Sequence, residues 1–575
     1  MIASVQYKRK INGKTVPYDI ENNNIREKAK DIASFRIINA KPLNRKVTFH
    51  SGPPNSGKTY TALKSLSNAR NGIYCAPLRL MAFEIYESLT KKGLKCNLIT
   101  GEEQILTHSH PQIICCTIEM TNFSNEYDIG IIDEIQMMDC KSRGFAWTRA
   151  YLQLNCSELH VCGDLRTLPL LQRISTTLND VINVFKYQRK TQLIIDDSSL
   201  NGNFNHLQPG DAVVVFSRQA VFDLKKSIEH HTSYKCAVIY GKLPPGPRRH
   251  QATLFNDNKL KQILVCTDAI GMGLNLNIKR IIFYTLKRKI NKLLLPIDHA
   301  QVHQIAGRAG RFNIFNQGHV TTFHQSDFLQ LQLYLQQTPT KSLRMGFFPS
   351  LDQFKRFKRQ LPFINSFSRL VMTFNNYAAL CEEDAFICDM DGFMKRVALL
   401  ETVSLKLEDK YYFCCAPCLP NPTLLTIANA FSTNKYIDIF GHLKSQFPSL
   451  INPQLTTEMV WDVLDHCRHP SEFVDIANDS LVLFHHDVIL NELEGFHQRI
   501  SLLCYLRYRH EQTKTWQREG YSHFYTAFLL EWLRMTTESC LESIMDQEEE
   551  TEAEQVRGFA DFSGFENALK HYFGI

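Results

Sequence analysis

The amino-acid sequence predicts an α/β fold in which two tandem parallel-sheet domains precede a mainly helical C-terminal region. Two observations support this class. Short, nearly all-apolar segments alternate with helical segments in two successive blocks, which is typical of parallel sheets covered on both faces. Beyond residue 325, leucines and aromatic residues recur at helical spacing instead. We therefore expect two sheet domains followed by helices.

The expected elements follow one another in a regular order. In the first block, apolar segments predict strands at 46–50, 72–77, 96–100, 112–117, 128–134 and 159–164, with helices at 59–69 and 78–92. In the second block, they predict strands at 212–216, 236–240, 263–268 and 280–284, with a helix at 218–230. The C-terminal region reads as helices with one strand-like stretch at 411–416. The expected regions are an N-terminal extension at 1–44, a first domain at 45–180, a second domain at 181–325, a helical region at 326–445 and a further helical region with an acidic segment at 446–575.

Length and composition are those of a multidomain globular protein. The 575 residues allow three or more domains, and 44% of them are hydrophobic while 21% are charged. No segment approaches the ~20 uninterrupted apolar residues of a membrane helix, and the N-terminal residues lack the apolar core of a secretory signal. The net charge of +7 permits a polyanionic partner. We therefore expect no membrane association and, with 17 cysteines, a reducing compartment.

A glycine-bounded loop between a strand and a helix is the most informative segment. It has the spacing of a Walker A phosphate loop, in which the two glycines let backbone N–H groups approach a polyphosphate. Lys58 adds a positive charge for the β- and γ-phosphates, and the Thr59 hydroxyl can ligate Mg²⁺. The flanking strand and helix disfavour a solvated turn. The residues expected to hold the nucleotide are Gly52, Pro53, Pro54, Asn55, Ser56, Gly57, Lys58 and Thr59.

An acidic pair, Asp133 and Glu134, ends a strand of the first block. Ligands of parallel sheets bind at the carboxyl ends of the strands, so this pair should lie beside the phosphate loop. Asp133 would then hold Mg²⁺, directly or through water. Glu134 would orient and deprotonate the water that attacks the γ-phosphate.

Two arginines near the end of the second block, Arg308 and Arg311, are spaced three residues apart. At the start of a helix this spacing directs both guanidinium groups to the same side. Arginine carries a permanent charge and a planar fork suited to a γ-phosphate. We therefore expect both residues to act as arginine fingers on a nucleotide held by the first domain, which would make domain closure depend on ATP.

Two basic segments leave a structural and a functional interpretation open. Arg79, at a strand-to-helix junction, suits a contact with a polyanion backbone, or its helix merely packs. The basic residues at 355–359 lie among Phe354 and Phe357, so they could track a nucleic-acid strand by phosphate contacts and stacking. The alternative is a solvated helix face with its aromatic rings in the core.

Taken together, these motifs resemble those of a superfamily-two helicase. The residues that carry the resemblance are Gly-Pro-Pro-Asn-Ser-Gly-Lys-Thr at 52–59, Asp-Glu-Ile-Gln at 133–136, Thr-Asp-Ala-Ile-Gly-Met-Gly-Leu-Asn at 267–275 and Gln-Ile-Ala-Gly-Arg-Ala-Gly-Arg at 304–311. The residues of these motifs are similar to those of the RNA helicase of the mitochondrial degradosome, the suppressor-of-Var family, which has bacterial relatives. Segments at 100–103, 143–149, 351–354 and 412–417 extend the resemblance, which covers roughly residues 45–440.

The resemblance implies two RecA-like motor domains that use ATP and Mg²⁺ to unwind RNA duplexes, with 3′-to-5′ translocation, in RNA turnover. It implies that Gln304, together with the two arginines, senses the γ-phosphate, and that Gly271 and Gly273 lie in the loop that couples nucleotide to nucleic acid. Pro54 departs from the family, which usually carries Thr there, and stiffens the loop without altering the residues that follow it.

The resemblance also bears on partners and location. It implies RNA, single-stranded or duplex, as the substrate of a monomeric motor, and often an exoribonuclease as partner. Without a clear presequence, we expect a cytoplasmic protein of bacterial or viral type, with the mitochondrial matrix as the alternative. Nothing in these motifs reads a 2′-hydroxyl, so a helicase that also acts on DNA stays open. So does a nucleic-acid-stimulated ATPase that remodels complexes without unwinding.

Overall fold

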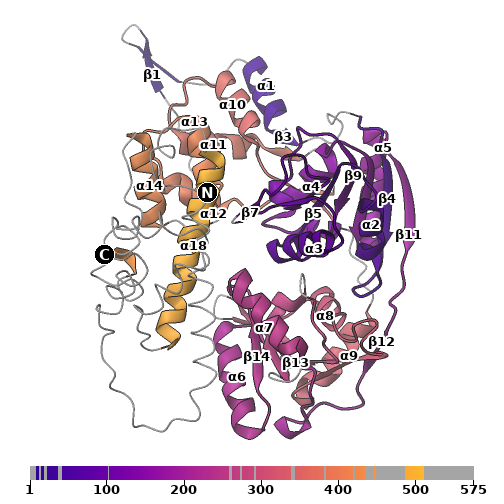
Figure 1. Cartoon of the computed structure of the whole chain (residues 1–575). Coiled ribbons are helices and arrows are strands. Elements are labelled where there is room, and N and C mark those ends of the chain that lie inside the picture. Colours follow the sequence, from indigo (N-terminus) through magenta and orange to yellow (C-terminus); the bar gives the residue numbers. More distant parts are fainter. Residues whose placement is uncertain are drawn as a thin grey trace, which may run out of the picture.

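Two parallel sheets, joined by a short linker and flanked by a helical region, organise the chain (Figure 1). The computed structural model describes residues 8–11, 14–17, 23–35, 42–101, 103–257, 262–271, 275–290, 293–337, 343–380, 384–416, 418, 421–433, 445–447 and 486–510. Most of the region expected at 446–575, including its acidic segment, lies outside these residues. No helix of the described residues is long and apolar enough to cross a bilayer.

The first sheet has eight strands in the order β11-β4-β10-β9-β5-β8-β6-β7. Their bounds are β4 (Lys46–Ser51), β5 (Gly72–Ala76), β6 (Cys96–Ile99), β7 (Gln104–Ile105), β8 (Ile113–Thr117), β9 (Tyr127–Ile132), β10 (Cys156–Gly163) and β11 (Val181–Lys186). Only β7 pairs antiparallel, with β6. The helices are α2 (Lys58–Leu66), α3 (Arg79–Lys91), α4 (Gly144–Gln153) and α5 (Leu168–Leu178). Helices α2 and α3 pack on one face and α4 and α5 on the other, so both faces are buried.

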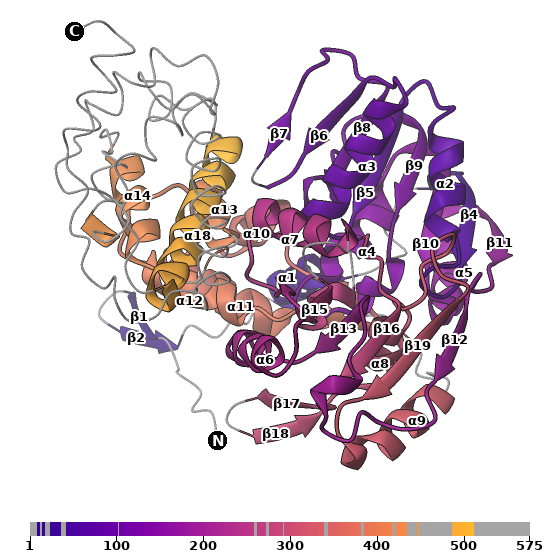
Figure 2. The same cartoon turned by 60° about the horizontal axis from the view of Figure 1, so that its bottom comes forward.

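The second sheet has six strands, all parallel, in the order β12-β19-β16-β13-β15-β14. Its strands are β12 (Gln192–Ile195), β13 (Asp211–Val214), β14 (Cys236–Ile239), β15 (Ile263–Cys266), β16 (Arg280–Phe283) and β19 (Gln317–Thr322). Its helices are α6 (Arg218–His231), α7 (Pro245–Asp257), α8 (His299–Ala306) and α9 (Phe328–Gln336). A hairpin of β17 (Lys287–Ile290) and β18 (Leu293–Pro296) lies at the periphery of this domain (Figure 2).

Strand β11, which the sequence assigned to the second domain, belongs to the first sheet. Each of its residues from Val181 to Lys186 pairs in parallel with β4. A buried ion pair precedes it, in which Arg45 donates to Asp180 with an Nη2–Oδ2 distance of 2.6 Å. This pair anchors the end of α5 to the start of β4 and sends the chain along the sheet edge. The boundary at 180 is therefore too early, and the linker runs from residue 187 to 191.

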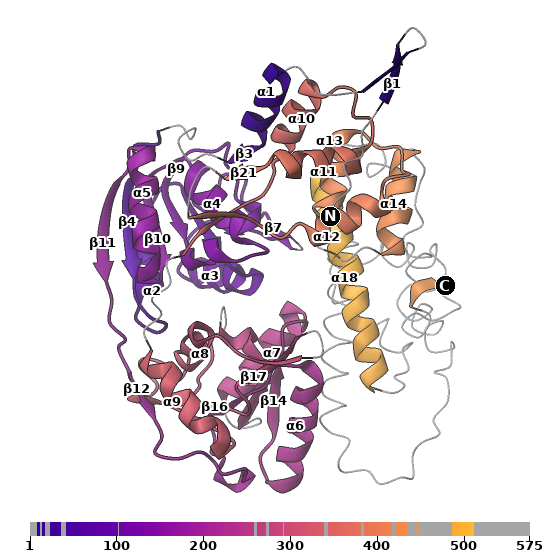
Figure 3. The same ribbon diagram turned by 180° about the vertical axis from the view of Figure 1, so that it is seen from behind.

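The C-terminal region is mainly helical, as expected, and part of the N-terminal segment packs against it. Its elements are α10 (Leu351–Gln360), α11 (Phe367–Tyr377), α12 (Asp391–Leu399), α13 (Leu407–Cys414), α14 (Pro422–Ser432), α18 (His486–His510), β20 (Met345–Phe347), β21 (Ala379–Leu380) and β22 (Ala385–Ile387). From the N-terminal segment, α1 (Asn23–Ala33) packs on α10 and α11, and β3 (Ser34–Phe35) pairs with β21 (Figure 3). The hairpin of β1 (Lys8–Ile11) and β2 (Lys14–Pro17) precedes them.

The strand-like stretch at 411–416 forms part of helix α13, so the strand prediction is wrong. Tyr411 packs against Phe354 and Phe393, and its hydroxyl donates to the carbonyl of Pro349 at 2.9 Å. Two acidic residues in the first turn favour the helix through its dipole. Tertiary contacts of one aromatic face therefore override a local run of apolar residues.

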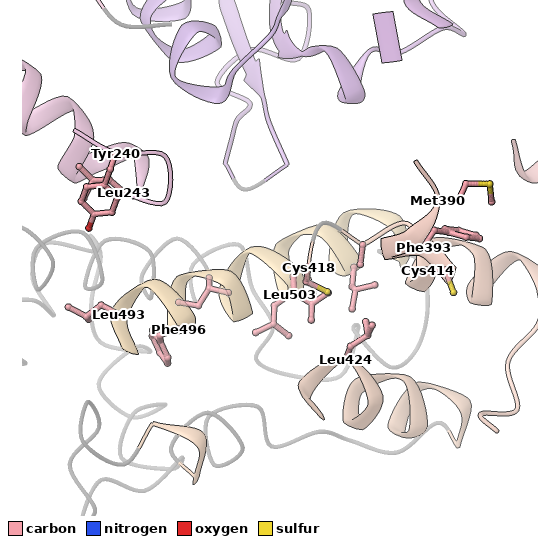
Figure 4. Close-up of a cluster of buried hydrophobic side chains, with 14 of the residues drawn as sticks. Tyr240, Leu243, Met390, Phe393, Cys414, Cys418, Leu424, Leu493, Phe496 and Leu503 are labelled. Carbon is pink, nitrogen blue, oxygen red and sulfur yellow. The ribbon is translucent and has the colours of Figure 1, made fainter. Parts of the chain in front are cut away.

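Helix α18 joins the helical region to the second sheet domain. At one end, Leu493 and Phe496 belong to the same hydrophobic core as Leu243 next to β14 (Figure 4). At the other end, Leu503 lies near Leu424 of α14 in this core. The carboxylate of Glu494 pairs with Arg218 at 2.8 Å, at the start of α6. This helix therefore braces the second domain against the rest of the chain.

Candidate nucleotide site between the two sheet domains

The phosphate loop lies between β4 and α2, as the sequence predicts. Gly57 has a φ of 87° and precedes α2 without a side-chain cap, so the first N–H groups of the helix are open to an anion. A Cβ atom at Gly52 would lie 2.8 Å from both the Ser56 hydroxyl and the carbonyl oxygen of Tyr187. The buried Ser56 Oγ has no hydrogen-bond partner among the residues that the structure describes. These features form a cradle that fits a polyphosphate.

Asp133 lies beside this loop and is fully buried. Thr59 Oγ1 donates to its Oδ1 at 3.3 Å, and the Tyr74 hydroxyl donates to its Oδ2 at 3.0 Å. Burial, and then the charge of Glu134, raise the pKa of Asp133 to about 6. A buried carboxylate next to a hydroxyl oxygen is a donor set suited to a hard cation such as Mg²⁺.

The backbone at Glu134 adopts a left-handed conformation, with φ 53°, that non-glycine residues rarely take. The side-chain amide of Gln136 donates to the Glu134 carboxylate. The Gln136 carbonyl oxygen in turn accepts from the backbone N–H of Asp164 at 3.2 Å. A Cβ at Gly163 would lie 2.6 Å from that same oxygen, which explains the glycine. The loop after β10 thus orients Gln136, which orients Glu134.

The sequence analysis did not identify Gln136 as a residue that positions Glu134. It also did not identify Trp147 as a residue that positions Asp133. The indole Nε1–H of this fully buried residue donates to the backbone carbonyl of Asp133 at 2.9 Å. Gln136 had a sequence signal as the last residue of the Asp-Glu-Ile-Gln quartet. Trp147, on α4, had none beyond the resemblance of its segment.

The second domain contributes its residues from α8 and the turn after it. Helix α8 ends at Ala306, so Arg308 and Arg311 follow a helix end and do not stand at a helix start as expected. Arg308 donates to the carbonyl of Gly271 at 2.9 and 2.5 Å. Arg311 donates to Asn277 Oδ1 at 2.6 Å. The two guanidinium groups are therefore anchored separately, and the argument from a shared helix face does not apply.

The two arginines share one charge of the first domain and differ in the others. Burial lowers the pKa of Arg308, while Glu134, Asp133 and Glu84 oppose that shift. Burial likewise lowers the pKa of Arg311, and Glu84 on α3 opposes it. Arg308 thus interacts with the acidic pair and with Glu84, whereas Arg311 interacts with Glu84, a residue that the sequence analysis did not consider.

The other residues expected to act in the second domain are Gln304, Gly271 and Gly273. Gln304 packs near Gly271, where a Cβ would lie 3.7 Å from its Cδ atom. Gly273 lies outside the described residues.

The expected nucleotide contacts Pro54 and Asn55 also touch the second domain directly. Asn55 Nδ2 donates to the carbonyl of Gly307 at 3.2 Å, and a Cβ at Gly307 would lie 2.9 Å from Pro54 Cγ.

Glu84 lies between the domains. Burial raises its pKa to about 7, although the backbone N–H of Asn275 and three arginines of the second domain oppose the shift. The neighbouring Phe83 ring receives the guanidinium of Arg249 at 3.8 Å from its centroid. Together these contacts connect α3 to α7 and to the loop before β16.

The two basic segments have different environments. Arg79 lies at the junction of α3, α7 and α18, where burial, Arg79 and then Arg248 lower the pKa of His497 to about 4. In the segment 354–359, Phe354 and Phe357 are fully buried, so their rings do not stack on bases. The aromatic residues of that segment belong to the core.

Two protein-family models match the sheet domains. The DEXQ-box helicase domain of Suv3 matches residues 35–187, and the helicase conserved C-terminal domain matches residues 192–313. The gap between them coincides with the linker after β11. The motor belongs to the Suv3 family of helicases. The resemblance seen in the motifs and the predicted fold class of two RecA-like domains with a helical C-terminal region are thereby confirmed.

Curated relatives of the Suv3 family share the motor and part of the helical region. The chain is 39% identical over 462 residues to "ATP-dependent RNA helicase SUV3 homolog, mitochondrial" of Drosophila pseudoobscura pseudoobscura, covering 76% of this chain and 60% of the relative. It is 39% identical to "ATP-dependent RNA helicase SUPV3L1, mitochondrial" of Mus musculus, covering 77% and 59%. It is 43% identical to "ATP-dependent RNA helicase SUV3, mitochondrial" of Oryza sativa subsp. japonica, covering 66% and 65%.

The chain thus spans about three fifths of the length of these relatives. Among solved structures, S. cerevisiae Dbp5 with Gle1 and IP6 is similar at a TM-score of 0.41 and 17% identity, covering 59% of this chain and 92% of that one. The relatives are named as mitochondrial proteins, which contradicts the expected cytoplasmic protein of bacterial or viral type. That expectation rested on the lack of a recognisable presequence. Presequences are recognised by their composition alone, and the motor domains carry no information about them.

Proposed function

We propose that this Suv3-type protein is an ATP-dependent RNA helicase that couples ATP hydrolysis to 3′-to-5′ translocation and duplex unwinding in RNA turnover. One observation carries the proposal. The phosphate loop of the first domain contacts the turn that carries Arg308 of the second, since Asn55 Nδ2 donates to the carbonyl of Gly307 at 3.2 Å, and the charges of Glu134 and Asp133 act on Arg308. Hydrolysis at this site would therefore require both domains in contact.

The first domain would bind the substrate nucleotide. The open N-terminus of α2 and the Lys58 ammonium would receive the β- and γ-phosphates. Asp133 and Thr59 would hold Mg²⁺, which would neutralise charge on the phosphate oxygens. Glu134, oriented by Gln136, would accept a proton from the attacking water.

The second domain would complete the site. Arg308, Arg311 and Gln304 would respond to charge on the γ-phosphate, and Gly273 would belong to the loop that couples this response to the RNA. Because Pro54 and Asn55 touch Gly307, the phosphate loop and the arginine-bearing turn would move together. Changes in the nucleotide would thus be transmitted to the angle between the domains.

The partners follow from the motor and its surroundings. RNA would cross the junction of α3, α7 and α18, where Arg79 and Arg248 gather positive charge. We further propose a monomeric motor, an exoribonuclease as partner and, from the names of the relatives, a location in the mitochondrial matrix. The proposed domains are a first motor domain ending with β11 at residue 186 and a second beginning with β12 at 192, followed by the helical region.

Steady-state ATPase activity with single-stranded RNA, with single-stranded DNA and with neither, at one fixed salt concentration, tests the proposal. Stimulation by RNA alone, followed by unwinding of a duplex with a 3′ overhang and not a 5′ overhang, is the expected result. Equal stimulation by DNA would indicate a mixed-substrate helicase. Stimulation without strand separation would indicate a remodelling ATPase, and no stimulation by either would contradict a nucleic-acid motor.

A further inference from the structure

The linker between the two sheets contains Arg189, which is not one of the residues expected to bind the nucleotide but which contacts the turn that carries Arg308. Arg189 donates from Nη1 to the carbonyl of Gly307 at 2.7 Å and from Nη2 to the carbonyl of Ala309. Its Nε donates to the carbonyl of Thr191 at 2.7 Å. All three nitrogens of one guanidinium are therefore bound to backbone oxygens, and two of those oxygens flank Arg308.

The next residue but one in the linker extends this arrangement. Thr191, which is 3% exposed, donates from Oγ1 to the carbonyl of Gly310 at 2.5 Å. The turn after α8 thus has three of its four carbonyls from residue 307 to 310 bound to linker side chains. Carbonyls at the end of a helix lack intrahelical partners, and a cation there also complements the helix dipole.

A single oxygen connects the linker to the phosphate loop. The carbonyl of Gly307 accepts from Arg189 at 2.7 Å and from Asn55 Nδ2 at 3.2 Å. A carbonyl oxygen has two lone pairs and can accept both bonds. Linker, phosphate loop and arginine-bearing turn therefore meet at this atom.

We propose that Arg189 is a positioning residue that holds the turn carrying Arg308 in register with the phosphate loop, so that linker geometry controls ATP hydrolysis. Arg189 does not touch the reacting atoms in this arrangement; it acts through Arg308. The inference rests on the proposed ATPase function. A displacement of about 1 Å in a group that stabilises a transition state can cost on the order of 10²-fold in rate.

Lysine does not reproduce this contact. Its ammonium is a point donor on a flexible stem, whereas the planar fork of Arg189 spans two carbonyls and a third at the same time. An Arg189→Lys variant keeps the charge and loses the fork, so it separates positioning from simple charge.

The test compares Arg189→Ala, Arg189→Lys, Arg308→Ala and the double variant Arg189→Ala/Arg308→Ala in the full chain. The matched control is Lys186→Ala, an exposed lysine at the end of β11. For each protein, kcat and KM for ATP with single-stranded RNA are measured, together with the affinity for a fluorescent ADP analogue and the midpoint of thermal unfolding.

We expect Arg189→Ala to lower kcat about tenfold or more while ADP affinity stays within about twofold. Arg189→Lys should lose nearly as much, and Lys186→Ala should match the wild type. Because Arg189 acts through Arg308, the double variant should be no slower than Arg308→Ala alone, within about twofold. Guanidinium ion at low millimolar concentration should partly restore the kcat of the Arg189→Ala variant. It should not restore the kcat of the double variant Arg189→Ala/Arg308→Ala.

Two results would overturn the inference. One is an unchanged kcat in Arg189→Ala when the wild type is active. The other is a double variant whose loss is the product of the two single losses, which indicates an independent, structural role. If Arg189→Ala does not fold, the same cycle with Arg189→Lys decides. Absence of ATP hydrolysis in the wild type would instead contradict the proposed function itself.

Discussion

The side-chain amide of Gln136 donates a hydrogen bond to the carboxylate of Glu134, and this bond links the acidic pair to the loop that follows β10. Glu134 stands in a left-handed backbone conformation, which also restricts its side chain. The carboxylate is therefore held by two constraints, one from the backbone and one from a neighbour. Both constraints lead to predictions.

Replacing Glu134 with Gln should abolish hydrolysis and spare binding. The amide keeps the size of the side chain and its contact with Gln136 but cannot accept a proton, so we expect kcat to fall ~10²–10⁴-fold. Affinity for a fluorescent nucleotide, measured by titration, should change little. Normal turnover in this variant would exclude the general-base role.

Replacing Gln136 with Ala should weaken turnover less than the change at Glu134. The carboxylate loses the donor that orients it but keeps its chemistry, so a fall in kcat of about tenfold is expected, with KM for ATP unchanged. The measurement is the RNA-stimulated ATPase rate over a range of ATP concentrations. An effect on KM alone would mean that Gln136 serves binding and not orientation.

The two arginines of the second domain should differ in their effects. Glu84 interacts with both arginines, but Glu134 and Asp133 interact with Arg308, so Arg308→Ala should reduce kcat more than Arg311→Ala, by ~10-fold or more. Both should leave nucleotide affinity nearly intact. ATPase assays on both variants check this order. RNA-stimulated activity that survives Arg311→Ala intact would remove that residue from the set of arginine fingers.

Arg45→Ala should destabilise the first domain. The side chains of Arg45 and Asp180 are both inaccessible to solvent, and removal of one partner leaves a buried charge unpaired. A loss of about 3–5 kcal/mol in the free energy of unfolding is typical of such a change. Denaturant unfolding measures it. Arg70→Ala, which breaks a solvent-exposed pair with Asp128, is the control and should cost ~0–1 kcal/mol.

The histidine pair below the phosphate loop predicts a dependence of stability on pH. His50 contacts His160 and the Tyr187 hydroxyl, each at 2.8 Å, and burial followed by the charge of His160 lowers its pKa to about 4. Between pH 6.5 and 4 the unfolded chain binds a proton there that the folded chain does not. Stability from this site is therefore present above pH 6.5 and lost as pH falls to about 4, by on the order of 2 kcal/mol.

A His50→Phe variant checks this effect, because the ring can still stack between His160 and Phe185 but cannot titrate. Its free energy of unfolding should fall less steeply over the same pH range, whatever its value at neutral pH. His110→Asn, at an exposed position, should follow the wild type. Parallel curves for the wild type and His50→Phe would contradict the assignment.

Local patterns were sufficient for most of the motor. The strands were predicted because short apolar runs bounded by turns have few alternatives, and their carboxyl ends must share an edge of the sheet. Lys58, Thr59 and Asp133 therefore come together as the spacing indicates. The pattern failed at α13 and left two interpretations open at Phe354, because the apolar and aromatic residues there serve a helical core whose partners lie far away in the chain.

The sequence by itself determined the family of the motor through the resemblance of its motifs. It also determined the two sheets and the residue types at the phosphate loop, because backbone spacing and glycine content restrict these locally. Only the three-dimensional structure showed that β11 belongs to the first domain and that Arg308 and Arg311 follow a helix end. It also showed that Arg189 binds the carbonyls beside Arg308. The pairing of β11 with β4 and the contacts of Arg189 join residues more than a hundred positions apart, and the Arg189 contacts also depend on how the two domains pack together. No local pattern encodes that packing, since many surfaces of similar composition satisfy the same spacing.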